Sequence, residues 1–134
     1  MVTHDYYGRD GSYRGHKVLD GDIAKYYDAQ GRYKGYRDYK TGMVFGARGE
    51  YKGRVSNYGT ITKLFDARGN YKGYRDKVTG KRFGAHGEYK GRRDKDGKIF
   101  GAHGEYGGRS VTRGGESKKS VGIFGFFKAL FGKH

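Results

Sequence analysis

The sequence predicts an all-β protein in which repeated short β-hairpins close into a shallow, pseudo-symmetric barrel, with a short apolar helix at the C-terminus. Three observations lead to this fold class. A ten-residue motif recurs six times, each copy is joined to the next by a second glycine-containing turn, and aliphatic residues are too scarce for an ordinary α/β core. Gly contributes 27 of the 134 residues and aromatic residues 16%, so we expect a core of Phe and Tyr packed on Gly.

The repeated motif places an aromatic residue, a glycine turn, a tyrosine and a second glycine at fixed offsets. The copies begin 17 to 20 residues apart. A unit of this length holds two short strands and two turns but no helix, so each copy is expected to form one hairpin of a domain covering residues 1–109. The six copies are YYGRDGSYRG from Tyr6, YYDAQGRYKG from Tyr26, VFGARGEYKG from Val44, LFDARGNYKG from Leu64, RFGAHGEYKG from Arg82 and IFGAHGEYGG from Ile99.

The hairpin register follows from the turn chemistry of the motif. A three-residue loop at 47–49 fits a type I turn followed by a left-handed residue, a conformation that Gly49 adopts without steric cost. Phe45 then lies opposite Tyr51 as a cross-strand aromatic pair. The equivalent pairs are Tyr27–Tyr33, Phe65–Tyr71, Phe83–Tyr89 and Phe100–Tyr106.

Strict alternation along the strands then predicts which face each side chain occupies. The aromatic pairs and the glycine two residues after each tyrosine, such as Gly53, are expected inside the barrel, and the cations outside. Tyr36 and Tyr74 are expected outside as well. The net charge of +15 exceeds the roughly 2–8 that solubility requires, so we expect the outer face to meet an anionic surface. The outer cations of this expectation are Lys34, Lys52, Arg54, Lys72, Lys90 and Arg92.

The edges of so many short strands have to be closed or capped. Closure into a barrel removes the edges altogether, whereas a solenoid of hairpins would expose its terminal rings unless special caps were present. The first and last copies differ little from the others and resemble no cap. The barrel is therefore favoured over the solenoid.

The chain changes character after residue 109. Residues 110–120 form a polar Gly/Ser/Lys linker, and residues 121–134 are expected to form an apolar helix. These 14 residues are fewer than the roughly 20 that span a bilayer. The helix is expected either to plug the barrel or to lie in a membrane interface, with Lys118 and Lys119 at the headgroups. Its bulky arc consists of Ile123, Phe124, Phe126, Phe127, Leu130 and Phe131.

Over residues 6–109 the pattern aromatic-[Asp/Gly]-Ala-x-Gly-x-Tyr-Lys-Gly resembles the bacterial β-flower repeat proteins. Choline-binding-type repeats use similar turns but carry Trp cages, and this sequence contains no Trp. The β-flower shape is in turn similar to the tubby-like and scramblase-like barrels. That resemblance implies a hydrophobic C-terminal helix running through the barrel and basic residues that meet anionic phospholipids.

The sequence offers no pattern typical of a catalytic or metal site. Most acidic residues lie at turn positions, where a carboxylate accepts hydrogen bonds from the turn backbone. His86 and His103 occupy equivalent turn positions that hold Arg48 and Arg68 in other copies, which argues against a metal role. There is no Cys. We therefore expect no enzyme activity, no cofactor, no metal and no small-molecule substrate.

Two functions fit these observations. The first is a module that binds anionic lipid or a membrane surface through the basic outer face and the apolar C-terminal helix. The alternative is a protein that binds nucleic acid or another polyanion, although tyrosines that face inward would offer few stacking partners to bases. The start of the chain, residues 1–5, lacks a basic-then-apolar signal. The expected location is therefore the cytoplasm, in part at the inner face of the membrane.

Overall fold

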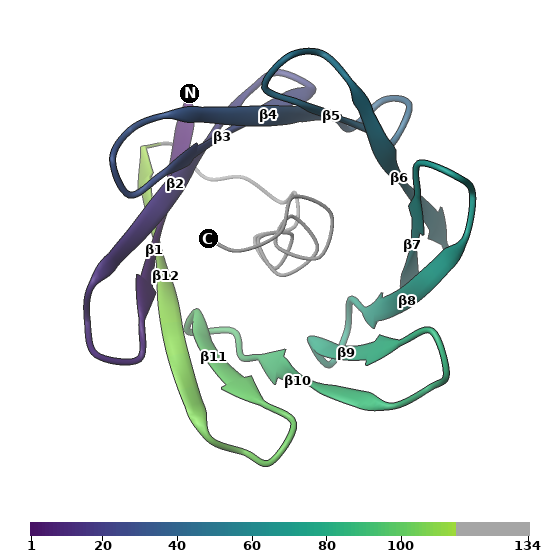
Figure 1. Ribbon diagram of the computed structural model, residues 1–134. Coiled ribbons are helices and arrows are strands. Elements are labelled where there is room, and N and C mark those ends of the chain that lie inside the picture. Colours follow the sequence, from purple (N-terminus) through teal and green to yellow (C-terminus); the bar gives the residue numbers. More distant parts are fainter. Residues whose placement is uncertain (115–134) are drawn as a thin grey trace.

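The computed structural model describes residues 1–114, which form a closed barrel of twelve antiparallel strands (Figure 1). Each strand pairs with its neighbours in the sequence, and the last strand pairs with the first. The predicted all-β barrel of repeated hairpins is confirmed. The strands are β1 (Val2–Gly8), β2 (Tyr13–Asp20), β3 (Ile23–Asp28), β4 (Tyr33–Asp38), β5 (Met43–Gly46), β6 (Tyr51–Tyr58), β7 (Ile61–Asp66), β8 (Tyr71–Asp76), β9 (Lys81–Gly84), β10 (Tyr89–Arg93), β11 (Lys98–Gly101) and β12 (Tyr106–Gly114).

The barrel extends further along the chain than the sequence indicated. β12 pairs with β1 along its length, from Gly108 opposite Gly8 to Gly114 opposite Val2. Residues 110–114, expected as the start of a polar linker, are therefore part of the barrel wall. The expected helix over residues 121–134, together with Lys118 and Lys119, lies outside the described residues.

The two rims of the barrel carry different turns. The loops inside the six motif copies lie at one rim, here called the hairpin rim, and the hairpins splay outward around the ring (Figure 1). The loop at 47–49 has the expected geometry: Gly49 has a φ of 82°, and the Gly46 N–H donates to the Glu50 carbonyl at 2.8 Å. The turns between copies lie at the other rim, here called the terminal rim, together with the start of β1 and the end of β12.

A β-bulge in every copy changes which face its side chains occupy. Phe45 pairs with Tyr51 as predicted, but the next pair is Val44 with Gly53, so Lys52 is an extra residue on its strand. Register shifts occur at the equivalent place in the five other hairpins. Because one added residue moves the following side chains to the opposite face, Tyr51 and Gly53 lie on opposite faces. The expectation that the aromatic pairs face the interior is therefore wrong.

The glycine that follows each bulge joins one copy to the next. A Cβ on Gly73 would lie 2.2 Å from the Phe83 carbonyl oxygen, and its φ of 129° is rare for other residues. The same approach recurs between Gly108 of the last copy and the Tyr7 carbonyl of the first, so one contact both links the copies and closes the ring. The six equivalent glycines, one in each copy, are called the repeat glycines: Gly15, Gly35, Gly53, Gly73, Gly91 and Gly108.

The interior contains aliphatic residues and tyrosine where the sequence suggested phenylalanine. The residue before each motif's outer aromatic ring faces inward, as Tyr26, Val44 and Leu64 do, and these are 1–3% exposed. They pack with Val2, Leu19, Ala24 and Val55. The described phenylalanines lie on the opposite face, because each pairs with an outward-facing tyrosine.

Candidate anion-binding surfaces

Aromatic rings on the outside of the barrel form a repeated three-part stack. In the third copy the Tyr51 ring meets the Phe45 ring edge-on at 5.9 Å between centroids, and Tyr36 stacks on the other side of Phe45 at 5.0 Å. Tyr36 comes from the preceding copy, on the neighbouring strand β4. Each stack therefore bridges two copies across the barrel wall.

The third member of the stack varies around the barrel, between an aromatic ring and a cation. It is His16 on Tyr27, Tyr36 on Phe45, Arg54 on Phe65, Tyr74 on Phe83, Arg92 on Phe100 and Arg109 on Tyr7, at 4.8 to 5.1 Å from the ring centroid. Strict strand alternation predicted Tyr36, Arg54 and their equivalents on the face opposite the aromatic pairs. The bulge instead brings all of them together on the outer face, as an outer girdle of six stacks.

The tyrosines of the girdle are open to solvent near the hairpin rim. Each follows directly after a hairpin loop, and Tyr13, Tyr33, Tyr51, Tyr89 and Tyr106 are 36–40% exposed. The lysine after the tyrosine lies beside it, exposed at Lys72 and Lys90 and half-buried at Lys34 and Lys52. Arg54 is exposed and Arg92 half-buried. The described cations predicted from the sequence thus surround the tyrosines and do not lie on a separate face.

Carboxylates near these lysines offset their charge only slightly. The Lys52 and Lys90 ammonium groups each lie 3.9 Å from a glutamate oxygen, of Glu50 and Glu88 respectively. Pairs this exposed contribute about 0–1 kcal/mol. Hydrogen bonds with the loop backbone hold the pKa of both glutamates below its usual value. The exposed Lys90 therefore remains available to an external anion.

A second group of cations lines the inside of the barrel. The residue two positions after each repeat glycine faces inward, and these six equivalent positions define a ring that we call the bore ring. Four of the six residues are cationic. The bore ring consists of Lys17, Arg37, Val55, Arg75, Arg93 and Ser110.

Three of the four bore cations are buried, Arg93 is half-buried, and the four repel one another. Lys17 is fully buried, Arg37 is 4% exposed and Arg75 9%. Burial lowers the pKa of Lys17 well below its usual value, and the charges of Arg37, Arg93 and Arg75 lower it further. Burial also lowers the pKa of Arg93 to about 10. An additional cation, Arg82, stands next to Arg75 across β8 and β9.

A tyrosine provides part of the cations' surroundings. The Tyr39 hydroxyl accepts a 3.5 Å hydrogen bond from the Lys17 ammonium group, and the Arg37 guanidinium lies 4.1 Å from the Tyr39 ring centroid. Burial raises the pKa of Tyr39, so the phenol is neutral at pH 7 and adds no negative charge. Tyr39 therefore offers the bore ring a hydroxyl group and the face of its ring, but no negative charge.

Acidic side chains on the inner face are occupied elsewhere. Asp28 and Asp66 lie near the hairpin rim, where Asp28 accepts from Arg32 Nε at 2.7 Å and Asp66 accepts from the Asn70 backbone at 2.9 Å. Within residues 1–114, no ion pair includes Arg37, Arg75 or Arg93. In the same residues, buried atoms of these three arginines and Ser110 Oγ have no hydrogen-bond partner.

The bore ring was missed although strand alternation places its residues on the same inner face as the repeat glycines. The signal was present: the second residue after a repeat glycine is Lys17, Arg37, Arg75 and Arg93 in four of the six copies. Counted from the inward-facing repeat glycine, a period of two assigns these residues to the inner face. The bulge changes the face of the tyrosines and leaves this assignment unchanged.

The described residues hold no cluster of metal-ligating side chains. Residues 1–114 contain no group of three or more His, Asp or Glu side chains that could hold a metal ion. The turn aspartates accept hydrogen bonds from their own loops, as Asp38 does from the Lys40 N–H at 2.8 Å and Asp76 from the Val78 N–H at 2.8 Å. In this part of the chain no helix is long and apolar enough to cross a membrane.

Comparison with known proteins found no matching family model, no similar curated protein and no similar solved structure.

Proposed function

We propose that this protein is a non-enzymatic module that binds the surface of anionic phospholipid membranes through its outer girdle. The observation that carries the proposal is the ring of half-exposed tyrosines beside exposed lysines near one rim. Tyrosine rings favour the headgroup level of a bilayer, because one end of the ring is apolar and the other polar. Each Lys or Arg near an anionic leaflet adds about 1 kcal/mol.

The symmetry of the girdle suits a flat partner. Six equivalent hairpins reach the same rim, so their tyrosines, and the lysines that follow four of them, lie near that rim all around the barrel axis. A planar surface can meet all of them at once. A linear polymer would follow one arc and leave the others unused.

One observation favours a second candidate, binding of single-stranded nucleic acid. The tyrosines face outward beside Arg54, Arg92 and Arg109, and this combination of rings and cations can stack bases and attract phosphates. The sequence-based argument against this function assumed tyrosines that face inward. That argument no longer holds.

Co-sedimentation with vesicles tests the membrane proposal. The full chain is expected to bind phosphatidylglycerol-containing vesicles and not neutral phosphatidylcholine vesicles, and binding is expected to fall steeply with salt. The double variant Lys72→Gln/Lys90→Gln is expected to weaken binding about 30-fold at low salt, since two cations contribute about 2 kcal/mol. Lys40→Gln/Lys77→Gln, two exposed lysines at the terminal rim, is the matched control and is expected to change binding much less.

Two results would contradict the membrane proposal. One is equal binding to neutral and anionic vesicles at low salt. The other is an equal loss of binding in the two double variants, which would indicate attraction by net charge alone. Tight binding of a single-stranded oligonucleotide at the same salt, with weak vesicle binding, would favour the second candidate.

The function of the C-terminal segment is a separate part of the proposal. We propose that residues 121–134 supply apolar insertion into the interface. Deletion of residues 121–134 is expected to reduce vesicle binding and leave the melting temperature of the barrel unchanged. A lower melting temperature with increased dye binding would favour a plug inside the barrel. No change in either quantity would exclude both functions.

A further inference from the structure

Two buried arginines of the bore ring, Arg37 and Arg75, have no carboxylate partner among the described residues. Arginine stays charged at any physiological pH, so Arg37 and Arg75 cannot escape burial by losing a proton. A buried guanidinium without a partner is strongly unfavourable unless an anion compensates it. Within residues 1–114 no carboxylate forms an ion pair with either group. An anion would compensate the charge of these two guanidinium groups.

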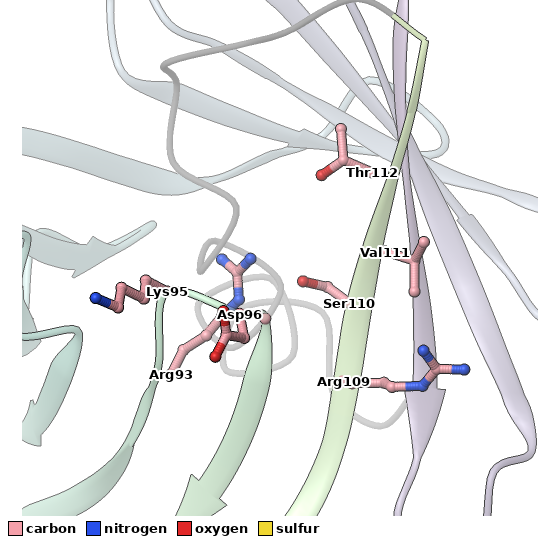
Figure 2. Close-up of a pocket in the computed structure, with 8 residues that line it drawn as sticks. Arg93, Lys95, Asp96, Arg109, Ser110, Val111 and Thr112 are labelled. Carbon is pink, nitrogen blue, oxygen red and sulfur yellow. The ribbon is translucent and has the colours of Figure 1, made fainter.

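A cavity at the terminal rim gives access to this ring. It has a volume of about 260 Å³ and lies between the β10–β11 turn and β12. Figure 2 shows the guanidinium of Arg93 and the hydroxyl of Ser110 directed into this space, with Arg109 and Val111 on the other side of β12. Arg93 Nε and Ser110 Oγ are buried atoms without a hydrogen-bond partner in the described part of the chain. Two unused hydrogen-bonding groups of the bore ring therefore line one opening.

We propose that the bore ring binds a phosphate-bearing anion that enters through this cavity, with Arg93 and Ser110 at the entrance and Arg37 and Arg75 further around the ring. Several planar guanidinium groups around one axis match a group that presents oxygens in several directions, as a tetrahedral phosphate does. A planar carboxylate would satisfy one arginine and leave the others unpaired. The phosphate can belong to a soluble ester or to a lipid headgroup.

Arginine variants of the bore ring test the proposal in the full chain. Inorganic phosphate and pyrophosphate are titrated by calorimetry at constant ionic strength, and melting is followed in parallel. Both anions are expected to bind and to raise the melting temperature. The double variant Arg75→Gln/Arg93→Gln is expected to lose at least about 30-fold in affinity, as hydrogen bonds to charged groups contribute about 1.5–3 kcal/mol each. Lys81→Gln, an exposed lysine next to Arg82 in the chain, is the control and is expected to bind as the unchanged protein does.

The melting temperature without ligand shows whether the bore-ring arginines bind an anion or hold the barrel together. Arginines that merely hold the barrel together would lower the melting temperature when replaced. Arginines whose function is to bind an anion repel one another when no anion is bound. The double variant is therefore expected to melt at the same or a higher temperature than the unchanged protein. If the double variant does not fold, Arg93→Lys keeps the charge, removes the planar fork and is expected to weaken pyrophosphate binding about tenfold.

Two outcomes overturn the proposal: absence of both heat and stabilisation with phosphate and pyrophosphate, or equal affinities in the double variant and the unchanged protein. Vesicles containing phosphatidic acid identify the source of the phosphate. Bore variants that lose both soluble phosphate and vesicle binding indicate a headgroup. Variants that lose soluble phosphate alone indicate a soluble ester. Lys72→Gln/Lys90→Gln is expected to retain phosphate binding, so failure of the membrane proposal is distinguishable from failure of this one.

Discussion

Arg92 and Arg93 are adjacent on β10, and the barrel places them in opposite environments. The Arg92 guanidinium lies 4.9 Å from the Phe100 ring centroid on the outer face. Arg93 faces the bore, where burial lowers its pKa to about 10. The comparison shows that in this protein the bulge, and not the residue type, decides whether a cation belongs to the outer girdle or to the bore ring.

The largest expected loss of stability comes from filling the space at a repeat glycine, the residue that follows the bulge. Gly73→Ala is expected to cost about 4 kcal/mol or more, because the added Cβ would lie 2.2 Å from the Phe83 carbonyl oxygen at a φ of 129°. Gly69→Ala, at a φ of 85° in open space, is the control and is expected to cost about 1–2 kcal/mol. Urea unfolding measures both. Similar costs would show that the close approach between copies does not limit stability.

We expect tyrosines on the inner and outer faces of the barrel to differ in how far their replacement lowers the free energy of unfolding. Tyr26 is 1% exposed inside the barrel, and Tyr26→Ala is expected to cost about 3–5 kcal/mol. Tyr71 packs at a tilt against Phe65, with 5.8 Å between the ring centroids, on the half-open outer face, so Tyr71→Ala is expected to cost about 1–2 kcal/mol. Chemical denaturation of the two variants gives the difference directly. The reverse order would place the girdle rings in the core after all.

The interior also makes stability depend on pH through His4. This residue is 1% exposed, and its Nδ1 lies 2.9 Å from Thr112 Oγ1. Burial lowers the pKa of His4 from 6.5 to about 4, assisted by the charges of Lys17 and Arg93 and opposed by that of Asp5. The unfolded chain therefore binds the proton first. The resulting stability is complete above pH 6.5 and is lost as pH falls toward 4, by at most about 3 kcal/mol.

Melting curves between about pH 5 and 7 isolate this effect, because the carboxylates titrate mainly below that range. His4→Gln is expected to flatten the dependence. His16, on the outer face, also has its pKa lowered by burial, so His16→Gln is the comparison and is expected to leave most of the slope. An unchanged slope in His4→Gln would exclude His4 as the source.

The sequence predicted the parts of the fold that depend on local chemistry. The loop at 47–49, the left-handed Gly49 and the Phe45–Tyr51 pair follow from turn preferences within seven residues, and all are present. The bulge at Lys52 could not be predicted in the same way, because it depends on how Gly53 meets the Phe65 carbonyl of the next copy. That contact exists only in the assembled barrel. One unplaced residue was enough to put the aromatic pairs on the wrong face.

The smallest expected effect concerns the variable member of the outer stacks. Arg54 lies 4.8 Å from the Phe65 centroid, where the preceding copy and the following one have Tyr36 and Tyr74 over their phenylalanines. A double-mutant cycle of Arg54→Ala with Phe65→Leu is expected to give a coupling of about 0.5–1 kcal/mol, as for exposed cation–π pairs. Arg54→Tyr is expected to change stability by less than about 0.5 kcal/mol, since an aromatic stack replaces the cation contact at similar strength. Urea unfolding measures all five proteins. A coupling near zero would show that the girdle cations lie over the rings without holding the copies together. The same Arg54→Tyr variant keeps the barrel and replaces one outer charge by a ring, so its vesicle binding compares a cation with a tyrosine at one girdle position.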